Sequence, residues 1–318
     1  MRFQVRDGAI LQAIYDYDGV LSRRHLKSMF WSTTSLQAME RRLSLLYHNR
    51  YLDWPSKEQR GTKPIPEPIV WLGWKGILWI AGCNDVAIMP PTNENETQLR
   101  SLNRKLRERG IRWLREPRWS QLEHDLMVVD FRLTIENATS KLPSLSLNEW
   151  IPEGEFLSHT DVIEYTFNGY DGKLRWMRKG VRPDGYFVVV DEFRHIQGTP
   201  ARARFLLELD HATYDNARFG REKALPGVAY IRSPAYKGRF GYNSGRWLVV
   251  TTGSVRMKNL IHQTQQVLGK AAKVFFFTTF DMIETKNILI DPIWWQVDGG
   301  EPISLFSTSA HQRAILVD

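Results

Sequence analysis

Two short acidic segments in the second half of the chain could carry chemistry. Pro183-Asp184 opens one expected strand, and Glu208-Leu209-Asp210 ends another. Because side chains alternate along a strand, Glu208 and Asp210 project from the same face. Carboxylates that converge on one point of a sheet bind Mg²⁺, which polarises a phosphate and activates a water molecule. We therefore predict Mg²⁺-dependent phosphodiester hydrolysis, with three catalytic and metal-binding carboxylates, Asp184, Glu208 and Asp210.

Both segments also have structural interpretations, which the sequence leaves open. Pro183-Asp184-Gly185 is a common turn sequence. The carboxylates of the second segment could form ion pairs, since a buried carboxylate is costly unless it is paired or bound to a metal. The candidate partners are Arg182, Arg202 and Arg204. A shared metal ion instead requires the carboxylates of Asp184 and Glu208 to lie within roughly 6 Å of each other.

The segments around these residues predict a sheet with helices. Helical patterns cover residues 215–223 and 255–268. Strands that alternate with helices favour a mixed α/β (α+β) domain, which we place at residues 119–318. The strand-like apolar stretches are residues 162–167, 186–190, 205–209, 247–251 and 274–278.

The positive charge of the chain is concentrated in its first third. The formal net charge is +8; residues 1–118 hold 20 Lys and Arg against 12 Asp and Glu, and the remaining residues hold 23 of each. A neutral domain with a basic neighbour favours a polyanionic partner at the basic end. The sequence has no apolar run near the roughly 18 residues that span a bilayer, and its single cysteine, Cys83, cannot form an internal disulfide. We expect a cytoplasmic protein without membrane contact.

The basic end has the pattern of a helix-turn-helix. Apolar spacing predicts helices over residues 7–17, after a cap at Ser22, and after residues 32–34. The third helix directs one stripe toward the core, made of Leu36, Met39, Leu43 and Leu46. Its opposite side carries small, amide and guanidinium groups, which can read base edges in the major groove. These candidate DNA-binding residues are Thr34, Gln37, Ala38, Arg41 and Arg42.

A wing is expected directly after the third helix. A strand near residues 51–54 precedes a polar loop, and an apolar return follows at residues 69–72. The loop carries three basic residues that can reach phosphates, Lys57, Arg60 and Lys63. A three-helix module for protein binding or dimerisation is the alternative. We assign residues 1–83 to a winged helix-turn-helix domain and residues 84–118 to a linker and connecting helix.

The two acidic segments, Pro183-Asp184 and Glu208-Leu209-Asp210, resemble the pattern of the PD-(D/E)xK nuclease superfamily. In that pattern Pro-Asp is followed by Asp/Glu-x-Lys on the next strand. Asp210 stands where the pattern has lysine, and a carboxylate cannot supply that positive charge. The resemblance implies a restriction-endonuclease-like mixed sheet. It also implies that a lysine from the following helix, Lys223, takes the catalytic place of the missing one, with His211 as a second candidate.

The whole chain, from about residue 7 to 295, resembles the replication-relaxation family of plasmids and mobile elements. This resemblance implies DNA binding and a nuclease-like second domain, without settling whether that domain cuts. Besides the winged helix, it rests on His124-Asp125-Leu126, Trp150, Arg182-Pro183-Asp184-Gly185, Glu208-Leu209-Asp210, Thr213, Lys223 and Tyr230.

Two functions follow. In the first, the protein binds double-stranded DNA and hydrolyses it with Mg²⁺ during replication or mobilisation. In the second, it is a catalytically inactive DNA-binding regulator of replication or transcription that uses the nuclease-like fold for binding or dimerisation. A homodimer on paired half-sites is possible by analogy with other helix-turn-helix proteins.

Overall fold

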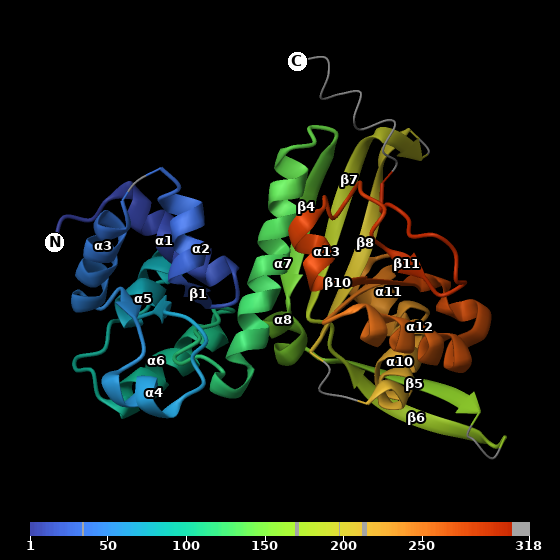
Figure 1. Ribbon diagram of the computed structural model, residues 1–318. Coiled ribbons are helices and arrows are strands. Elements are labelled where there is room, and N and C mark those ends of the chain that lie inside the picture. The colour runs from blue at the N-terminus through green and yellow to red at the C-terminus, as the bar shows by residue number, and fades with distance from the viewer. Residues whose placement is uncertain (34, 169–171, 197, 212–214, 307–318) are drawn as a thin grey trace. The chain divides into compact units, whose positions relative to one another are not determined.

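The chain folds into two compact units, which are described separately. The computed structural model describes residues 1–33, 35–168, 172–196, 198–211 and 215–306. The first unit covers Met1–Asp130 and the second covers Phe131–Asp318, and each combines helices with strands (Figure 1). The predicted α+β class is confirmed, with a mixed six-stranded sheet in the second unit. No helix in the described ranges is both long and apolar enough to cross a membrane.

The first unit packs helices around a small antiparallel sheet. The strands are β1 (Val20–Ser22), β2 (Leu52–Asp53) and β3 (Ile69–Leu72), in the order β1-β3-β2. Apolar residues of β1 and β3 pack on the start of the last helix of the unit through Leu122 and Leu126. The helices are α1 (Val5–Asp16), α2 (Arg23–Phe30), α3 (Leu36–His48), α4 (Lys57–Thr62), α5 (Trp74–Cys83), α6 (Glu96–Glu108), the short η1 (Trp119–Gln121) and α7 (Leu122–Ser140), which continues into the second unit.

The third helix of this unit, α3, begins later than the sequence suggested. Its N-cap is Ser35, whose Oγ accepts a hydrogen bond from the Ala38 amide at 3.3 Å. The first turn extends beyond the core, because residues 35–38 are all exposed. Leu36, predicted to face inward, is therefore 53% exposed, whereas Met39 and the two leucines that follow it in the stripe are buried.

The segment between β2 and β3 contains a helix rather than only an extended loop. Ser56 caps α4: its Oγ accepts from the Gln59 amide at 3.1 Å, and its own amide donates to Gln59 Oε1 at 2.9 Å. Reciprocal capping of this kind satisfies two amides at a helix start. The apolar return predicted at residues 69–72 forms β3.

The first compact unit includes more of the chain than residues 1–83, which we assigned to the winged helix-turn-helix domain. The predicted connecting helix is α6, which buries Leu102 and Leu106, and the indole of Trp113 donates to the Leu72 carbonyl at 2.9 Å. Residues 84–118, for which we predicted a linker and a connecting helix, fall within this compact unit. The compact unit ends at Asp130, within α7.

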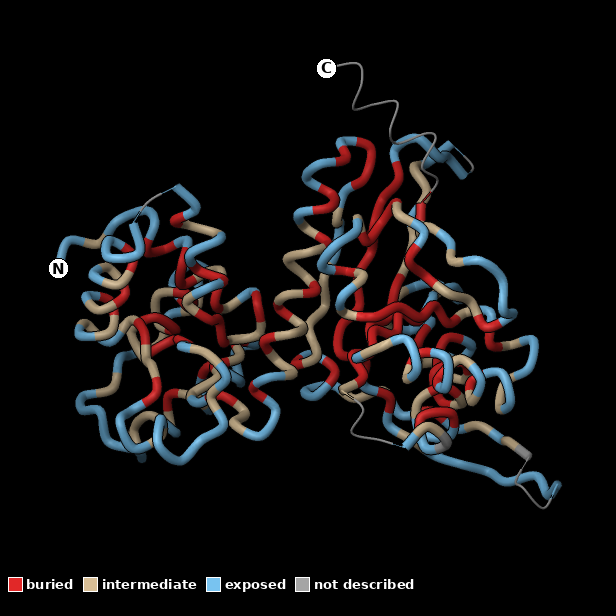
Figure 2. The backbone as a smooth tube through the Cα atoms, in the orientation of Figure 1, coloured by how far each residue is buried: buried red, intermediate tan, exposed pale blue. Residues whose placement is uncertain are grey.

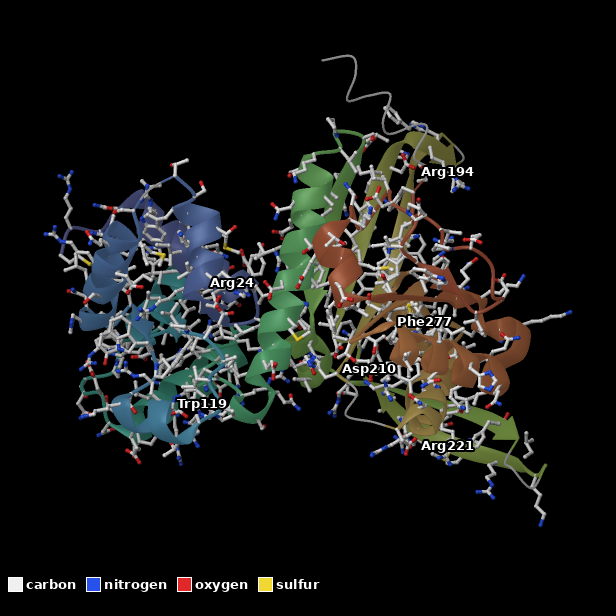
Figure 3. All side chains as sticks on the ribbon, in the orientation of Figure 1. Arg24, Trp119, Arg194, Asp210, Arg221 and Phe277 are labelled. Carbon is white, nitrogen blue, oxygen red and sulfur yellow. The ribbon has the colours of Figure 1, made fainter. Side chains whose placement is uncertain are left out.

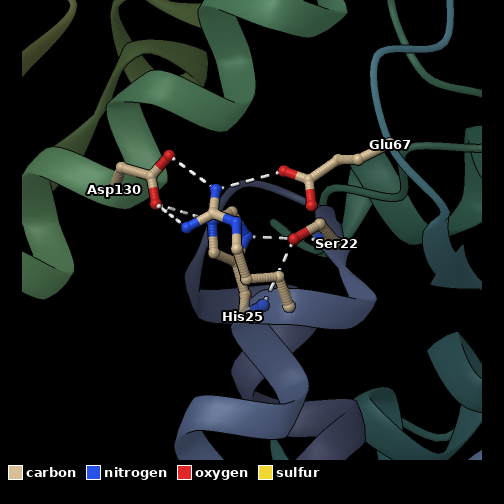
Figure 4. Close-up of polar contacts among 5 residues, drawn as sticks. Ser22, His25, Glu67 and Asp130 are labelled. Atoms are coloured by element: carbon tan, nitrogen blue, oxygen red, sulfur yellow. Dashed lines mark hydrogen bonds and ion pairs between the residues drawn. The ribbon is translucent and has the colours of Figure 1, made fainter.

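A polar cluster ties Asp130 of α7 to the start of α2 (Figure 4). The Asp130 carboxylate accepts from His25 Nε2 at 3.0 Å and from both terminal nitrogens of Arg24 at 2.8 and 2.9 Å. His25 is buried, and its Nδ1 accepts from the Ser22 amide at 3.2 Å. Because Nδ1 accepts this bond, the proton of the neutral ring is on Nε2, facing Asp130. The cluster therefore fixes the tautomer of His25 and the capping box between Ser22 and His25 at the start of α2.

The second unit is built on a six-stranded sheet in the order β11-β10-β9-β8-β7-β4. β8 pairs antiparallel with β7 and parallel with β9, so the sheet is mixed. The strands are β4 (Leu145–Pro152), β7 (Gly185–Ile196), β8 (Thr199–Asp210), β9 (Arg246–Thr251), β10 (Phe275–Thr279) and β11 (Trp295–Gln296). The helical elements are α8 (Glu153–Ser158), α9 (Asn216–Phe219), η2 (Gly220–Ala224), α10 (Leu225–Ile231), α11 (Pro234–Phe240), α12 (Ser254–Leu268), η3 (Gly269–Val274) and α13 (Phe280–Thr285).

Helices cover both faces of this sheet (Figure 1). On one face, Tyr186 and Trp247 belong to an apolar cluster with residues of α10 and α12. On the other face, Phe131 of α7 lies 5.9 Å from Phe187, measured between ring centroids. The central strands are the most continuously buried part of the unit (Figure 2). Their ends can therefore hold side chains in fixed positions.

A separate two-stranded ribbon joins α8 to β7. It consists of β5 (Asp161–Asn168) and β6 (Leu174–Val181), paired antiparallel. Asp161 anchors the ribbon, because it accepts from the Tyr230 hydroxyl and from Arg239 Nε, the latter at 2.6 Å. β6, which the sequence analysis did not predict, is exposed over most of its length, and Trp176 is 59% exposed.

Candidate active site and DNA-binding surface

Asp184 and Glu208 lie beside each other at one end of the β7–β8 pair. Gly185 pairs with Leu207, so the next residues outward, Asp184 and Glu208, are neighbours across the two strands. The Asp184 amide donates to the Leu207 carbonyl at 2.9 Å, and Asp184 Oδ2 accepts from the Leu209 amide at 2.6 Å. Asp184 and Glu208 are only 6% and 7% exposed. The structure thus brings together two of the three predicted carboxylates as buried neighbours.

Lys223, the predicted substitute lysine, reaches Glu208. Its Nζ lies 2.6 Å from Oε1 and 2.8 Å from Oε2 of Glu208. Lys223 is in η2, a single π-helical turn between α9 and α10, and turns of this type are frequent at functional sites. Gly220 starts the turn, and a Cβ at this position would lie 3.1 Å from Val267 Cγ2 and 3.3 Å from the Gln263 carbonyl. The absence of a side chain therefore allows the turn to pack closely on α12. Asp184, Glu208 and Lys223 are called the Glu208 site below.

Asp210 is held in an ion pair. Arg256 of α12 donates to both of its oxygens at 2.9 Å, and the Thr251 hydroxyl donates to Oδ2 at 2.6 Å. Asp210 is buried, at 3% exposure, and Arg256 is partly buried, at 14%. The partners of the two strand carboxylates are therefore Lys223 and Arg256, not the arginines weighed from the sequence. The position of Asp210 is well explained by its structural role between β8, β9 and α12.

A pocket of about 420 Å³ opens beside Glu208 and Lys223. It has an apolar floor that includes Phe219, Trp247 and Phe275. Its two acidic residues are Glu208 and Glu222, and its four basic residues are Lys179, Arg182, Arg218 and Lys223. The excess of cations suits an anionic ligand such as a phosphate.

Lys179, Arg218 and Glu222 are pocket residues that the sequence analysis missed. Lys179 of β6 forms an ion pair with Glu222 and donates to the Glu222 backbone carbonyl at 2.7 Å. The hydrogen bond from Lys179, which outweighs partial burial, lowers the pKa of Glu222. Arg218 and Glu222 precede Lys223 closely in the sequence, and this proximity could have identified them as residues of the same site. Lys179 gave none, because β6 was not predicted.

In the first unit, α3 presents part of the predicted DNA-reading face. Gln37, Ala38 and Arg41 are exposed, and within the described part of the chain Arg41 forms no ion pair. Arg42 differs, because its Nε donates to Oδ1 of the fully buried Asp7 at 2.7 Å and its Nη2 donates to the Arg2 carbonyl at 3.0 Å. Arg42 therefore ties α3 to α1. Thr34 lies outside the described residues.

The predicted wing cations are carried by α4 and the residue that follows it. Lys57 and Arg60 lie within the helix, Lys63 is its C-cap, and all three are exposed. The basic groups are thus presented on one short, capped helix instead of a flexible loop. This arrangement keeps them available to a polyanion.

A comparison with family models assigns the chain. The replication-relaxation model matches residues 11–224, about two thirds of the sequence. The chain belongs to the replication-relaxation family. The matched range includes α3, α4 and the Glu208 site, and ends directly after Lys223. No curated protein and no solved structure matches this replication-relaxation protein.

The residues of this replication-relaxation protein fit a metal ion in part. No group of three or more His, Cys, Asp or Glu side chains with metal-binding geometry occurs among the described residues. Mg²⁺ is commonly held by one or two carboxylates together with water, and Asp184 and Glu208 are adjacent. Asp210 does not fit, since Arg256 and Thr251 engage its oxygens. Asp184 and Glu208 are the two carboxylates that could hold an ion here, and Lys223 contacts both oxygens of Glu208.

The His124-Asp125 motif of the family resemblance has a structural explanation in this replication-relaxation protein. Asp125 lies in the first turn of α7, and Arg118 forms an ion pair with its carboxylate, with Nε 3.2 Å from Oδ2. Trp150, another residue of the resemblance, lies within β4 and stacks on Phe187 at 5.4 Å between ring centroids. The first contact therefore stabilises the start of α7, and the second packs β4 on β7.

Proposed function

We propose that this replication-relaxation protein binds double-stranded DNA through its first unit and hydrolyses phosphodiester bonds at the Glu208 site. The observation that carries the proposal is the contact of Lys223 Nζ with Glu208 Oε1, 2.6 Å apart, beside the buried Asp184. Two adjacent carboxylates and a lysine are the groups that this chemistry needs, and here the lysine comes from the following helical segment.

The roles of the side chains follow from their positions. Asp184 and Glu208 would hold Mg²⁺, which supplies Lewis acidity and an activated water when bound. Lys223 places a positive charge where negative charge develops on the phosphate, and such a charge is most effective in a partly dehydrated pocket. Lys179, Arg182 and Arg218 line the same pocket and attract the phosphate backbone.

DNA binding is supported by the architecture of the first unit. The order α1, β1, α2, α3, β2, β3 with a β1-β3-β2 sheet resembles that of a winged helix-turn-helix, and we infer that α3 is the helix that enters the major groove. Gln37 and Arg41 are then placed to contact base edges, and the cations of α4 to contact phosphates.

Plasmid nicking tests the cleavage part of the proposal. Supercoiled plasmid is incubated with the full chain and Mg²⁺ or Mn²⁺, and the wild type is compared with Glu208→Gln and Asp184→Asn. The control is Glu284→Gln, which alters an exposed carboxylate on α13 of the same unit. We expect nicking by the wild type and the control and its loss in the two site variants. Equal nicking by all four proteins would identify a contaminating nuclease.

A second function is favoured by the ion pairs themselves. Glu208 and Asp210 each have both oxygens bonded to a cationic side chain, an arrangement that stabilises a fold without a metal. A DNA-binding regulator of replication with a non-cutting second unit is therefore the alternative. It predicts unchanged duplex binding in the wild type, Glu208→Gln and Asp184→Asn, with no nicking by any of them.

A further inference from the structure

A second pocket lies at the other end of the β7–β8 pair. It has a volume of about 400 Å³, and three arginines line it, Arg194, Arg202 and Arg246, together with Phe193 and Phe306. These three arginines define the arginine pocket. Figure 3 shows Arg194 at the end of β7 and β8 opposite to Asp210. Arg202 and Glu208 are six positions apart along β8, which corresponds to roughly 20 Å at the rise of a strand, so the two pockets are distinct.

An irregularity in β7 shapes the arginine pocket. Asp191 pairs with Ala201, but the next pair joins His195 to Pro200, so residues 192–194 bulge out of the ladder. Asp191 Oδ1 accepts from the amides of Phe193 and Arg194 at 3.0 and 3.3 Å, which fixes the bulge. Bulges re-aim side chains and are frequent next to functional sites. Here the bulge brings Phe193 and Arg194 to the pocket.

The arginine pocket carries uncompensated positive charge. Within the described part of the chain, no carboxylate forms an ion pair with Arg194, Arg202 or Arg246. Asp191, the acidic residue in the lining, directs Oδ1 to backbone amides. Desolvation by the surrounding protein, and secondly the positive charge of Arg194, lower the pKa of Arg246. Guanidinium groups that lie near each other without forming ion pairs to carboxylates create a site for an anion.

We propose that the arginine pocket binds the phosphate group of a nucleotide, independently of the Glu208 site. Arginine presents paired donors that match phosphate oxygens, and the volume is that of a small-ligand pocket. Phe193 is 51% exposed and offers a ring on which a base can stack. The phosphate comes either from a free mononucleotide or from the backbone of a single strand.

Calorimetric titration of the full chain tests this proposal. The probes are dTMP and a thymidylate pentanucleotide, which is too short and single-stranded to serve as a duplex ligand for the first unit. The variants Arg246→Met and Arg202→Met remove the guanidinium group and keep an aliphatic chain of similar length. Both positions are exposed, so we expect these variants to fold. The control is Arg232→Met, which removes an exposed arginine of the same unit outside both pockets. Lys223→Met reports on the Glu208 site.

We expect both pocket variants to weaken binding about tenfold or more, the effect of losing a charge-assisted hydrogen bond, while Arg232→Met binds as the wild type does. Binding of both probes identifies a pocket for a mononucleotide, and binding of the pentanucleotide alone identifies one for a backbone phosphate. No binding by the wild type, or variants within twofold of Arg232→Met, would overturn the proposal. If Lys223→Met alone abolished binding of the probes, the ligand would lie at the Glu208 site, which would also overturn the proposal.

Discussion

Lys223 Nζ lies 2.6 Å from Glu208 Oε1, although the two residues are 15 positions apart and belong to a helical turn and a strand. This contact predicts that Lys223→Met lowers the nicking rate about 100-fold, the usual effect of removing one donor that stabilises developing charge. Lys223→Arg should retain part of the rate, since it keeps a positive charge. Single-turnover nicking measures both. Rates equal to that of the wild type would remove Lys223 from the mechanism.

The ion pair between Asp210 and Arg256 should contribute to folding rather than to cleavage. Asp210→Ala leaves a buried guanidinium without its partner, so we expect about 3–5 kcal/mol less stability. The double variant Asp210→Ala/Arg256→Met should recover much of that loss, because it removes both charges. Urea unfolding of the wild type, both single variants and the double variant measures the coupling. Stabilisation of the wild type, but not of Asp210→Ala, by Mg²⁺ would instead make Asp210 a metal ligand.

Arg41 and Arg42 are adjacent in sequence, but their variants should behave differently. Arg41→Ala should weaken specific duplex binding by about 1–3 kcal/mol, the value of one base contact, without lowering the melting temperature. Arg42→Ala should lower the melting temperature, because it leaves the fully buried Asp7 without its guanidinium partner. Fluorescence anisotropy with a selected duplex and thermal unfolding provide the two measurements. The reverse pattern would show that α3 presents a different face to DNA.

The cations of α4 should act through phosphates. In the Lys57→Ala/Lys63→Ala double variant, the slope of log affinity against log salt should become shallower by about one for each lost phosphate contact. Affinity should fall by the same factor for specific and unrelated duplexes. Lys258→Ala, which removes an exposed lysine of α12 in the second unit, is the control. A slope unchanged from that of the control would exclude α4 from the DNA interface.

The cluster around Asp130 predicts a loss of stability in acid. Burial tends to raise the pKa of Asp130, but hydrogen bonds from His25 and Arg24 outweigh it and lower the pKa from 3.8 to about 2. The stabilisation is therefore present above about pH 4 and is lost as the pH falls toward 2. Because the Asp130 side chain is 40% exposed, we expect its ionised form to contribute only about 1 kcal/mol to the free energy of unfolding after solvent screening.

Comparison with Asp130→Asn isolates this effect. In urea unfolding, the wild type should exceed the variant in stability at pH 6, and the difference should shrink steadily as the pH falls from about 4 toward 2. A difference that stays constant with pH would mean that the ionised form of Asp130 contributes nothing.

The sequence predicted the elements whose burial is regular. Strands β7 to β10 appear in the sequence as apolar runs because both faces of the sheet are covered. Ser22 indicated the start of α2 because a helix cap depends only on residues close in the sequence. β6 could not be predicted, since it is exposed over most of its length and shows no alternation. The pairing of Asp210 with Arg256 could not be predicted either, because the two residues are 46 positions apart in the sequence. Only the packing of the folded chain determines which arginine contacts Asp210.

The π-helical turn that carries Lys223 has a genetic consequence. A π-turn is an α-helical turn with one additional residue, so removing a residue from 220–224 would restore the ordinary helical repeat and change the position of Lys223 on the helix. A single-codon deletion can therefore withdraw the cation from the pocket while every remaining amino acid stays the same. Gain or loss of the lysine at this site is then a matter of helix length, not of residue replacement.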